Sequence, residues 1–276
     1  MGNNNVEAKD ILSCFRSENV GEVEQYSIGY DNIFTYPRTI CSIGKRYVDQ
    51  VFTCRFADAD MIDLSKLDIM KVQKIVRKNN AASSSFYGIK GEREFLQNIN
   101  KIPILKKYFC HYLDKKNFQK CLDNRNVKRA RNECKMRQAE NEYEIYYILQ
   151  MGNLKTQYRD SDEMVHQQVK LLLCLEKEKK AVVFYTEESQ KITGGIVAII
   201  LQNQLYMLVN NYIPRYLIHR PNDFLYNQLI HFAMEQDIDF INWGETEESD
   251  EGLMQFKKKY SSIIEEKKSL HLLWKV

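Results

Sequence analysis

The sequence contains few of the features that mark unusual classes of protein. Only four prolines and eleven glycines occur among its 276 residues, which excludes collagen-like and low-complexity architectures. No run of about 18 apolar residues exists, and the longest nearly apolar run covers only 196–201, so we expect no membrane-spanning helix. Because the first twenty residues lack an apolar core, we also expect no secretory signal peptide.

Cysteine pairs and a strong net charge are missing as well. The seven cysteines are an odd number without a Cys-x-x-Cys pair, which predicts reduced thiols in a cytoplasmic protein. Cys110 and His111 are adjacent rather than spaced as chelating ligands, so we expect no metal site. The 40 basic and 37 acidic side chains leave a formal net charge of +3, which by itself indicates no particular partner.

Positive charge is nevertheless concentrated between residues 101 and 140. This segment holds twelve Lys and Arg residues and four Asp and Glu residues, and twelve minus four gives a local excess of +8. Such an excess could meet a phosphate backbone or a nucleotide carrier. Between Asp114 and Glu140, however, only Phe118 could stack on a base, and this favours a solvated helix face.

The first part of the chain has the pattern of a small lobe. Residues 20–56 are rich in Tyr, Ile, Phe, Val and Thr, which is typical of short strands. Apolar residues recur at helical spacing over 63–77, and a polar loop is expected at 79–85. A short helix followed by a strand is expected over 90–112. We predict an N-terminal lobe over 1–113.

The remaining residues, 114–276, form the predicted second lobe, in which helices and strands alternate. Short turns join consecutive strands and helices come late, and this order favours an α+β fold with a mostly antiparallel sheet flanked by helices. In chain order, the expected elements are helix 117–142, strand 143–149, helix 161–177, strands 181–186, 194–201 and 204–211, helix 223–236, strand 239–243, helix 251–260 and strand 270–274.

Three pieces of this second lobe resemble a known family. They are "NFQKCLDNRNVKRARNEC" at 117–134, "HRPNDFLYNQLIHFAMEQDIDFINWG" at 219–244 and "DEGLMQFKKKY" at 250–260. In this order the lobe resembles the GNAT acyltransferase superfamily and, within it, the FemAB-like branch. The resemblance implies two GNAT-like lobes and transfer of an acyl group from acyl-coenzyme A to an amine acceptor. It also implies two alternatives: aminoacyl-tRNA as donor, with tRNA as a partner, or a GNAT fold that binds without catalysis.

The resemblance places the carrier along a strand and at a helix start. An amide-rich pantetheine arm can pair with an exposed strand edge, and the candidates for that edge are Leu208, Val209, Asn210 and Asn211. An ordinary core strand is the alternative interpretation of these residues.

The sequence "RPNDF" is the candidate for binding the pyrophosphate of the carrier. Backbone N–H groups at a helix N-terminus receive phosphate well, and Asn222 or Asp223 is the expected N-cap, followed by Phe224. Arg215 and Arg220 add positive charge nearby. The usual GNAT loop contains more glycine than this one, and a plain helix start explains the same residues.

The acyl site is expected at the third piece. Gly252, Phe256 and Lys257 match the Gly-x-x-x-Phe-Lys pattern of FemAB-like proteins, and Lys257 stands where simpler GNAT enzymes present a tyrosine that protonates the leaving thiolate. Tyr260 is a further catalytic candidate, and Phe256 is a candidate for contact with substrate. A solvated face is the alternative for the run of lysines at 257–259.

A general base is expected at the end of the preceding strand. Glu245 follows Trp243-Gly244 and could take a proton from the amine, while Trp243 is a second candidate for contact with substrate. Five carboxylates lie within 245–251, so a solvated acidic loop is the alternative.

Overall fold

The computed structural model describes residues 24–25, 34–42, 45–53, 62–97, 103–122, 124–153, 162–201 and 203–274. The first twenty residues, for which no signal peptide is expected, lie outside the described residues, as do Cys14 and Cys54. The chain divides into two compact units, here called unit 1 (Met1–Tyr108 and Glu266–Val276) and unit 2 (Phe109–Glu265).

Unit 1 contains a mixed sheet. In sheet order its strands are β1 (Glu24–Gln25), β2 (Phe34–Ser42), β3 (Lys45–Thr53), β5 (Ser83–Tyr87), β13 (Ile263–Leu273) and β7 (Pro103–Asp114), and the last two also contribute residues to unit 2. Pairing is antiparallel except between β3 and β5, among the pairs whose register is described. A separate parallel pair joins β4 (Ile62–Asp63) and β6 (Ile89–Lys90).

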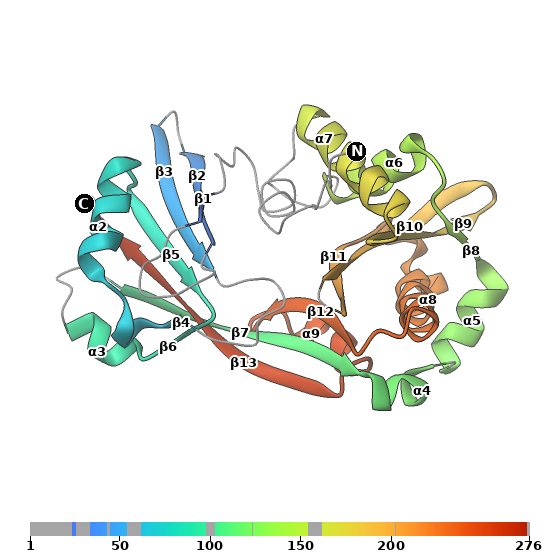
Figure 1. Cartoon of the computed structure of the whole chain (residues 1–276). Helices are drawn as coiled ribbons and strands as arrows, with labels where there is room; N and C mark the ends of the chain where they lie inside the picture. The colour runs from blue at the N-terminus through green and yellow to red at the C-terminus, as the bar shows by residue number, and fades with distance from the viewer. Residues whose placement is uncertain are drawn as a thin grey trace. The chain divides into compact units, whose positions relative to one another are not determined.

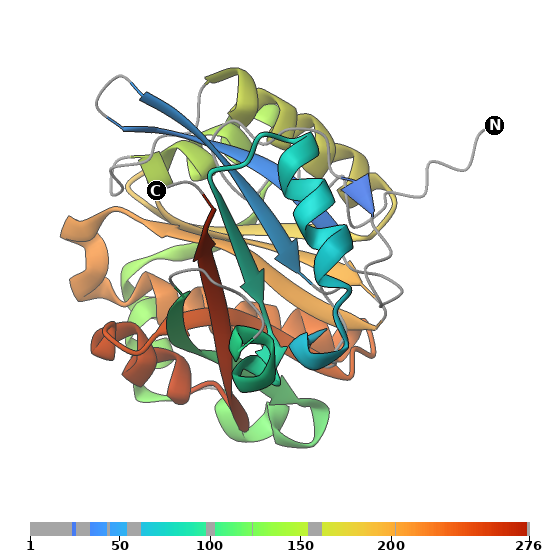
Figure 2. The ribbon, with the colours of Figure 1, turned by 90° about the vertical axis from the view of Figure 1, so that its left-hand side faces the viewer.

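One helix covers part of the sheet of unit 1 and contributes to its core. After the short η1 (Leu64–Lys66), Asp68 caps α2 (Ile69–Lys78), whose residues Val72, Ile75 and Val76 are buried. They cluster with residues of β5 and β13, and Figure 2 shows α2 running along these strands. The helix α3 (Glu92–Gln97) follows β6. The helix expected at 63–77 is confirmed from Ile69, whereas Leu67 and Asp68 are extended and separate it from η1; the helix and strand expected over 90–112 are confirmed.

Unit 2 contains the antiparallel meander that the sequence predicts. Its strands are β8 (Lys135–Gln138), β9 (Ala181–Glu188), β10 (Lys191–Leu201), β11 (Gln204–Tyr212) and β12 (Phe240–Glu247). Strands β8 to β11 pair antiparallel in chain order, whereas β11 pairs parallel with β12. Strand β7 follows β12 in the sheet order.

Helices cover both faces of this sheet (Figure 1). They are, in chain order, η2 (Lys115–Asn117), α4 (Phe118–Cys121), α5 (Arg125–Glu133), α6 (Glu142–Asn153), α7 (Asp162–Lys177), η3 (Pro214–His219), α8 (Pro221–Glu235) and α9 (Glu251–Lys258). A Cβ at Gly194 would meet Leu225 of α8, and one at Gly195 would meet Ile148 of α6. Because successive strand residues point to opposite faces, α6 and α8 lie on opposite faces of β10.

Three expectations about single elements are wrong. The loop at 79–85 ends in β5, because Ser84 and Ser85 are buried and pair with β3 and β13. The helix at 117–142 is divided into α4, α5 and the strand β8, since Asn124 caps a new helix and Cys134 is extended. The strand at 143–149 is the helix α6.

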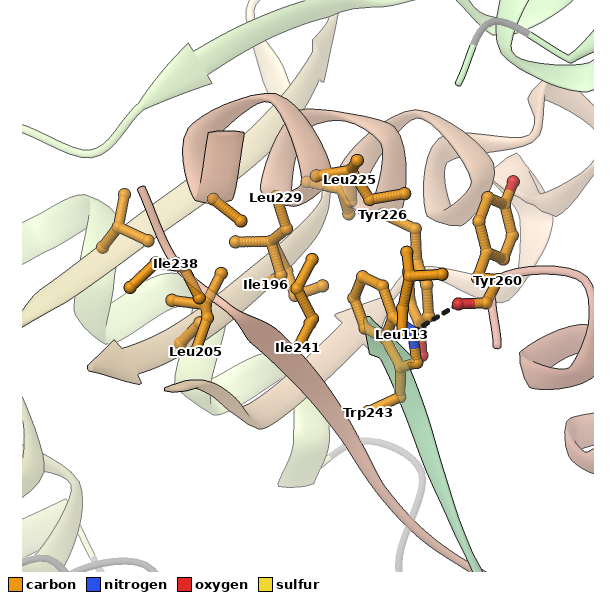
Figure 3. Packing of buried hydrophobic residues seen from close by; sticks show 14 of the residues in the cluster. Leu113, Ile196, Leu205, Leu225, Tyr226, Leu229, Ile238, Ile241, Trp243 and Tyr260 are labelled. Atoms are coloured by element: carbon orange, nitrogen blue, oxygen red, sulfur yellow. Dashed lines mark hydrogen bonds between the residues drawn. The ribbon is translucent and has the colours of Figure 1, made fainter. Parts of the chain in front are cut away.

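A cluster of aliphatic and aromatic side chains fills the core of unit 2 beneath α8 (Figure 3). Trp243 stacks on Tyr226 with ring centroids 4.3 Å apart, and the Trp243 Nε1 donates a hydrogen bond to the carbonyl of Tyr260 at 2.6 Å. Leu113, Ile196, Leu229 and other buried residues complete this cluster. Burial of this apolar area stabilises the fold at roughly 25 cal/mol per Å².

The predicted lobe boundary at 113 and 114 stays a prediction. Contacts divide the chain at Tyr108 and place residues 266–276 in unit 1, because β13 pairs there with β5. In the described part of the chain, no helix is long and apolar enough to cross a membrane.

Candidate active site

Strands β11 and β12 separate after a short stretch of pairing. Their parallel register covers only Gln204 to Tyr206 against Phe240 to Asn242, although β11 continues to Tyr212 and β12 to Glu247. We call the two diverging segments, 207–212 and 243–247, the strand fork. Where the two strands diverge, their facing edges are not joined by a ladder of backbone hydrogen bonds.

Local sequence features account for the separation. Between Val197–Val209 and Ala198–Met207 the register of β10 and β11 shifts, so Leu208 is the extra residue of a bulge. Bulges bend a strand and increase its twist. On the other side, Gly244 has a φ of +76°, and its N–H donates to the side-chain oxygen of Asn242 at 2.8 Å. This side chain supplies a partner where the ladder ends.

Lys257 brings a buried cation to the strand fork. Its side chain is only 3% exposed, and its Nζ donates to the carbonyl oxygen of Glu245 at 2.8 Å. A Cβ added to Gly244 would lie 3.8 Å from this Nζ and 3.9 Å from the carbonyl oxygen of Met207. Gly244 therefore leaves room between the Lys257 ammonium and the first carbonyl of the diverging part of β11.

Burial changes the acidity of this lysine. Desolvation lowers the pKa of Lys257 to about 8, and the Glu245 carboxylate opposes this shift. The charged and neutral forms of the side chain are thus both accessible near neutral pH, which is a property of catalytic rather than of ordinary surface lysines.

His111 of β7 is a second buried base in the same region. It is fully buried, and its Nδ1 lies 3.4 Å from the hydroxyl of Ser261, which itself donates to the carbonyl of Lys257 at 2.7 Å. Burial, together with the Lys257 charge, lowers the pKa of His111 to about 4. A neutral imidazole adds no second positive charge beside Lys257.

Two buried polar atoms on the strand fork lack a hydrogen-bond partner within the described chain. They are the amide oxygen of Asn210 on β11 and the hydroxyl of Thr246 on β12. Such atoms cost free energy unless water or a ligand completes them.

Helix α8 starts beside β11, earlier than expected. Pro221 is its first residue, and Arg220 is the N-cap with a left-handed φ of +60°, so the prediction of Asn222 or Asp223 as N-cap is wrong. The reason is that Arg220 also ends η3 by donating its N–H to Leu217. The side-chain oxygen of Asn222 is buried without a partner in the described chain.

Asp223 lies inside the protein rather than at its surface. The carboxylate is 2% exposed and accepts hydrogen bonds from the Tyr260 hydroxyl at 2.7 Å and from Asn126 at 3.3 Å. Phe224 packs against α5. The Asp223 carboxylate is thus part of a buried hydrogen-bond network, and Phe224 is part of a core contact.

The other carrier-site candidates differ in exposure. Leu208 and Val209 are half-buried, and Arg215 is exposed with its guanidinium 4.8 Å from the Tyr216 ring. Asn211 donates its side-chain amide to the carbonyl of Ile148 at 2.9 Å, which fixes the end of β11 against α6.

The remaining predicted site residues fall into two groups. Trp243 is fully buried and Tyr260 gives its hydroxyl to Asp223, so both belong to the aromatic core; burial raises the pKa of Tyr260. Phe256 meets Tyr226 edge to face at 4.9 Å and is half-buried. The Glu245 side chain is exposed at the strand fork, while its carbonyl holds Lys257.

Sequence reasoning found residues along both segments of the strand fork but missed the features that make the strands separate. Asn242 and Gly244 form an Asn-x-Gly pattern at a strand end, which is a recognisable signal for a left-handed glycine with a side-chain partner. The bulge at Leu208 and the burial of His111 have no comparable local signal.

Comparisons with known proteins identify the fold. No protein-family model and no curated protein sequence matches the chain. Solved structures do match it. A conserved protein of unknown function from Bacteroides thetaiotaomicron VPI-5482 is similar with a TM-score of 0.59 and 13% identity, covering 96% of this chain and 90% of that chain.

Two further similar structures are those of named proteins. FemX is similar with a TM-score of 0.55 and 11% identity, covering 88% of this chain and 85% of that chain. A GCN5-related N-acetyltransferase from Kribbella flavida is similar with a TM-score of 0.52 and 7% identity, covering 96% of this chain and 92% of that chain. The chain therefore has a GNAT-like α+β fold, as the sequence predicts.

Proposed function

We propose that the protein is an N-acyltransferase of the FemAB-like kind, which moves an acyl group from acyl-coenzyme A to an amine. One observation carries this proposal: β11 and β12 diverge at Leu208 and Gly244 and leave the buried Lys257 ammonium at the point of divergence. Fold likeness alone would not indicate a reaction.

The strand fork suits an extended thioester carrier. A pantetheine arm has amide groups that can pair with the edge of β11 over 208–211, in the manner of an added strand. The unpartnered oxygen of Asn210 and the hydroxyl of Thr246 offer further hydrogen bonds. In this arrangement the carrier's phosphates approach the start of α8, where Arg215 and Arg220 are exposed.

Lys257 is proposed to act when the thioester breaks. The amine nitrogen bonds to the carbonyl carbon, the carbon–sulfur bond breaks, and the thiolate takes a proton from the Lys257 ammonium. A thiol has a pKa of about 8.5, close to the value of about 8 for Lys257, so the proton moves with little change in free energy. The exposed Glu245 is proposed to accept the proton that the amine loses.

A second donor is supported by the charge of the chain. The segment 101–140 carries an excess of +8, and Lys128, Arg129 and Arg131 of α5 are exposed. An aminoacyl-tRNA could meet such a surface through its phosphates. This candidate keeps the same role for Lys257: when the ester bond of an aminoacyl-tRNA breaks, the ribose oxygen leaves as an alkoxide and takes the proton from the Lys257 ammonium.

The test uses a substitution that reduces the space at the strand fork and leaves the proposed catalytic side chains in place. In Gly244→Ala the new Cβ enters the space between Lys257 and Met207, and the positive φ costs about 1 kcal/mol of stability. We expect acetyl-coenzyme A to bind at least tenfold more weakly to this variant in titration calorimetry. Gly88→Ala is the matched control, because Gly88 also has a positive φ and its new Cβ would meet only the Tyr108 hydroxyl, at 3.9 Å, but Gly88 lies in unit 1.

The same panel separates the candidate donors. Binding of acetyl-coenzyme A that Gly244→Ala weakens and Gly88→Ala leaves unchanged supports the proposal. Binding of charged tRNA alone selects the second donor. If neither carrier binds, or if both glycine variants lose binding equally, the strand fork is not the carrier site.

A further inference from the structure

A second concave site lies in unit 2 where α4, the start of α5 and the end of α9 meet. Its volume is about 260 Å³, and we call it the basic pocket. The residues that line it are Lys120, Cys121, Asn124, Arg125, Asn126 and Lys259. Three of these six side chains are cationic, and no carboxylate belongs to the lining in the described part of the chain.

Two asparagines fix the wall of the basic pocket. The Asn124 side-chain oxygen caps α5 by accepting from the N–H groups of Asn126 and Val127 at 3.0 and 3.1 Å, and its amide donates to the Tyr260 hydroxyl at 3.1 Å. Asn126 donates to the buried Asp223 at 3.3 Å. The wall is therefore held by the core of unit 2, and a ligand meets a surface that needs little ordering.

Two of the three cations of the basic pocket have neutral neighbours. Lys120 donates to the side-chain oxygen of Asn117 at 2.8 Å, and the Lys259 ammonium lies 5.7 Å from the centre of the Phe256 ring. Neither contact cancels a positive charge. The Asp223 carboxylate behind Asn126 and the Asp114 carboxylate near Cys121 contribute two negative charges, so the three cations still leave an excess of positive charge around the pocket.

We infer that the basic pocket binds the phosphate group of a small phosphorylated metabolite. A phosphate monoester carries a charge of about −1.5 to −2 near pH 7 and has three acceptor oxygens. Three cationic side chains therefore suit a phosphate group better than a carboxylate group, which carries less charge. A guanidinium such as that of Arg125 can bind two of these oxygens at once. The volume accommodates a phosphate with a small organic group but lies below the usual range for larger ligands.

The experiment uses ribose 5-phosphate as the probe and ribose as its uncharged counterpart, with the full chain. We expect ribose 5-phosphate to bind and ribose not to bind in titration calorimetry. Arg125→Gln and Lys259→Gln should each raise the Kd at least tenfold. Lys128→Gln and Lys258→Gln are matched controls, because these exposed lysines lie on the same two helices outside the basic pocket, and they should change the Kd less than twofold.

Cys121 provides an independent readout inside the basic pocket. Ribose 5-phosphate should slow alkylation of Cys121 at least fivefold, as followed by peptide mass spectrometry. Cys174, which is also half-buried but does not line the pocket, should react at an unchanged rate. Protection of Cys121 that Arg125→Gln abolishes places the ligand in the pocket.

Two results would overturn the inference. An equal loss of affinity for ribose 5-phosphate in the pocket variants and in their controls shows diffuse charge attraction. Failure of ribose 5-phosphate and of inorganic phosphate to bind removes the site. Acetyl-coenzyme A affinity should stay unchanged in Arg125→Gln, while Gly244→Ala should keep ribose 5-phosphate affinity, so the two proposals fail separately.

Discussion

Arg220 combines an unfavourable backbone conformation with a candidate binding role. Its φ of +60° lies in the left-handed region, which costs a residue with a side chain about 1–2 kcal/mol. Strained residues of this kind concentrate at functional sites. The position of Arg220 between η3 and the buried Pro221 explains the conformation, because the chain must change direction before α8 can begin.

Replacement of Arg220 by glycine separates strain from binding. In Arg220→Gly the left-handed φ becomes favourable, and we expect the free energy of unfolding to stay constant or rise by up to about 1 kcal/mol. Loss of the guanidinium should weaken coenzyme A binding about tenfold. Lys179→Gly is the control, since Lys179 is also an exposed cation with a positive φ, of +57°. An unchanged coenzyme A affinity in Arg220→Gly would exclude the arginine from the carrier site.

We expect the buried Lys257 ammonium to lower the free energy of unfolding although it supports the proposed acyl transfer. The shift of its pKa from 10.5 to about 8 corresponds to about 3 kcal/mol against the folded state below pH 8. Because the folded pKa is the lower one, the unfolded chain binds the extra proton between pH 8 and 10.5. The free energy of unfolding contributed by this group therefore rises with pH across that window.

The variant Lys257→Met tests both consequences. Without the buried charge, and after loss of the hydrogen bond to Glu245, we expect a net gain in stability of about 2 kcal/mol at pH 7. Coenzyme A release from acetyl-coenzyme A should fall at least about 100-fold. In the wild type the rate should decline as pH rises through about 8, where the ammonium loses its proton. Lys258→Met, at an exposed position, should alter neither quantity; full activity in Lys257→Met would contradict the proposed role.

At the scale of elements, the close approach of α6 to β10 depends on a missing side chain. A Cβ at Gly195 would lie 2.5 Å from a methyl group of Ile148. The interior is close-packed, so such an overlap moves the helix or the strand. Asn211 holds the same helix from β11, which leaves α6 little freedom to retreat.

The substitution Gly195→Ala should therefore destabilise unit 2 by about 1–3 kcal/mol. In the double variant Gly195→Ala/Ile148→Ala, the new Cβ at position 195 fills part of the space that the Ile148 side chain leaves. The stability loss of the double variant should therefore be smaller than the sum of the losses in the two single variants. Denaturant unfolding of the two single variants and the double variant gives the coupling. Strict additivity would show that the two elements do not meet as described.

The same helix shows where sequence patterns mislead. Tyr and Ile residues predicted a strand at 143–149, yet Ile145, Ile148 and Leu149 are buried while Tyr143 is exposed, which is helical spacing. Residue preference for strands depends on context, whereas spacing follows geometry. The meander of β9, β10 and β11 was predictable because apolar runs and short turns define hairpins locally.

The candidate site was predictable only in part. The Gly252-to-Lys257 pattern singled out Lys257, and the structure places this residue at the strand fork. The fork itself depends on the register of β11 against two neighbours and on one bulged residue, Leu208. Register is a property of paired strands, so no single segment carries the signal.

At the scale of the whole molecule, each unit has its own core and its own tryptophan. Trp274 packs against the cluster of unit 1 and donates to Ser84 at 2.7 Å, whereas Trp243 is buried in unit 2. The chain contains only these two tryptophans. Single-tryptophan variants, Trp243→Phe and Trp274→Phe, therefore report on one unit each by fluorescence.

Leu270 tests whether the two cores unfold independently. It is fully buried in the cluster of unit 1, so Leu270→Ala should cost that unit about 2–5 kcal/mol. In the Trp243→Phe background, where Trp274 is the reporter, the urea midpoint should fall; with Trp243 as reporter it should shift by less than half as much. Leu229→Ala, in the cluster of unit 2, should give the reverse pattern. Equal shifts at both tryptophans would show that one cooperative transition joins the units, because local damage would then lower the stability of the entire chain.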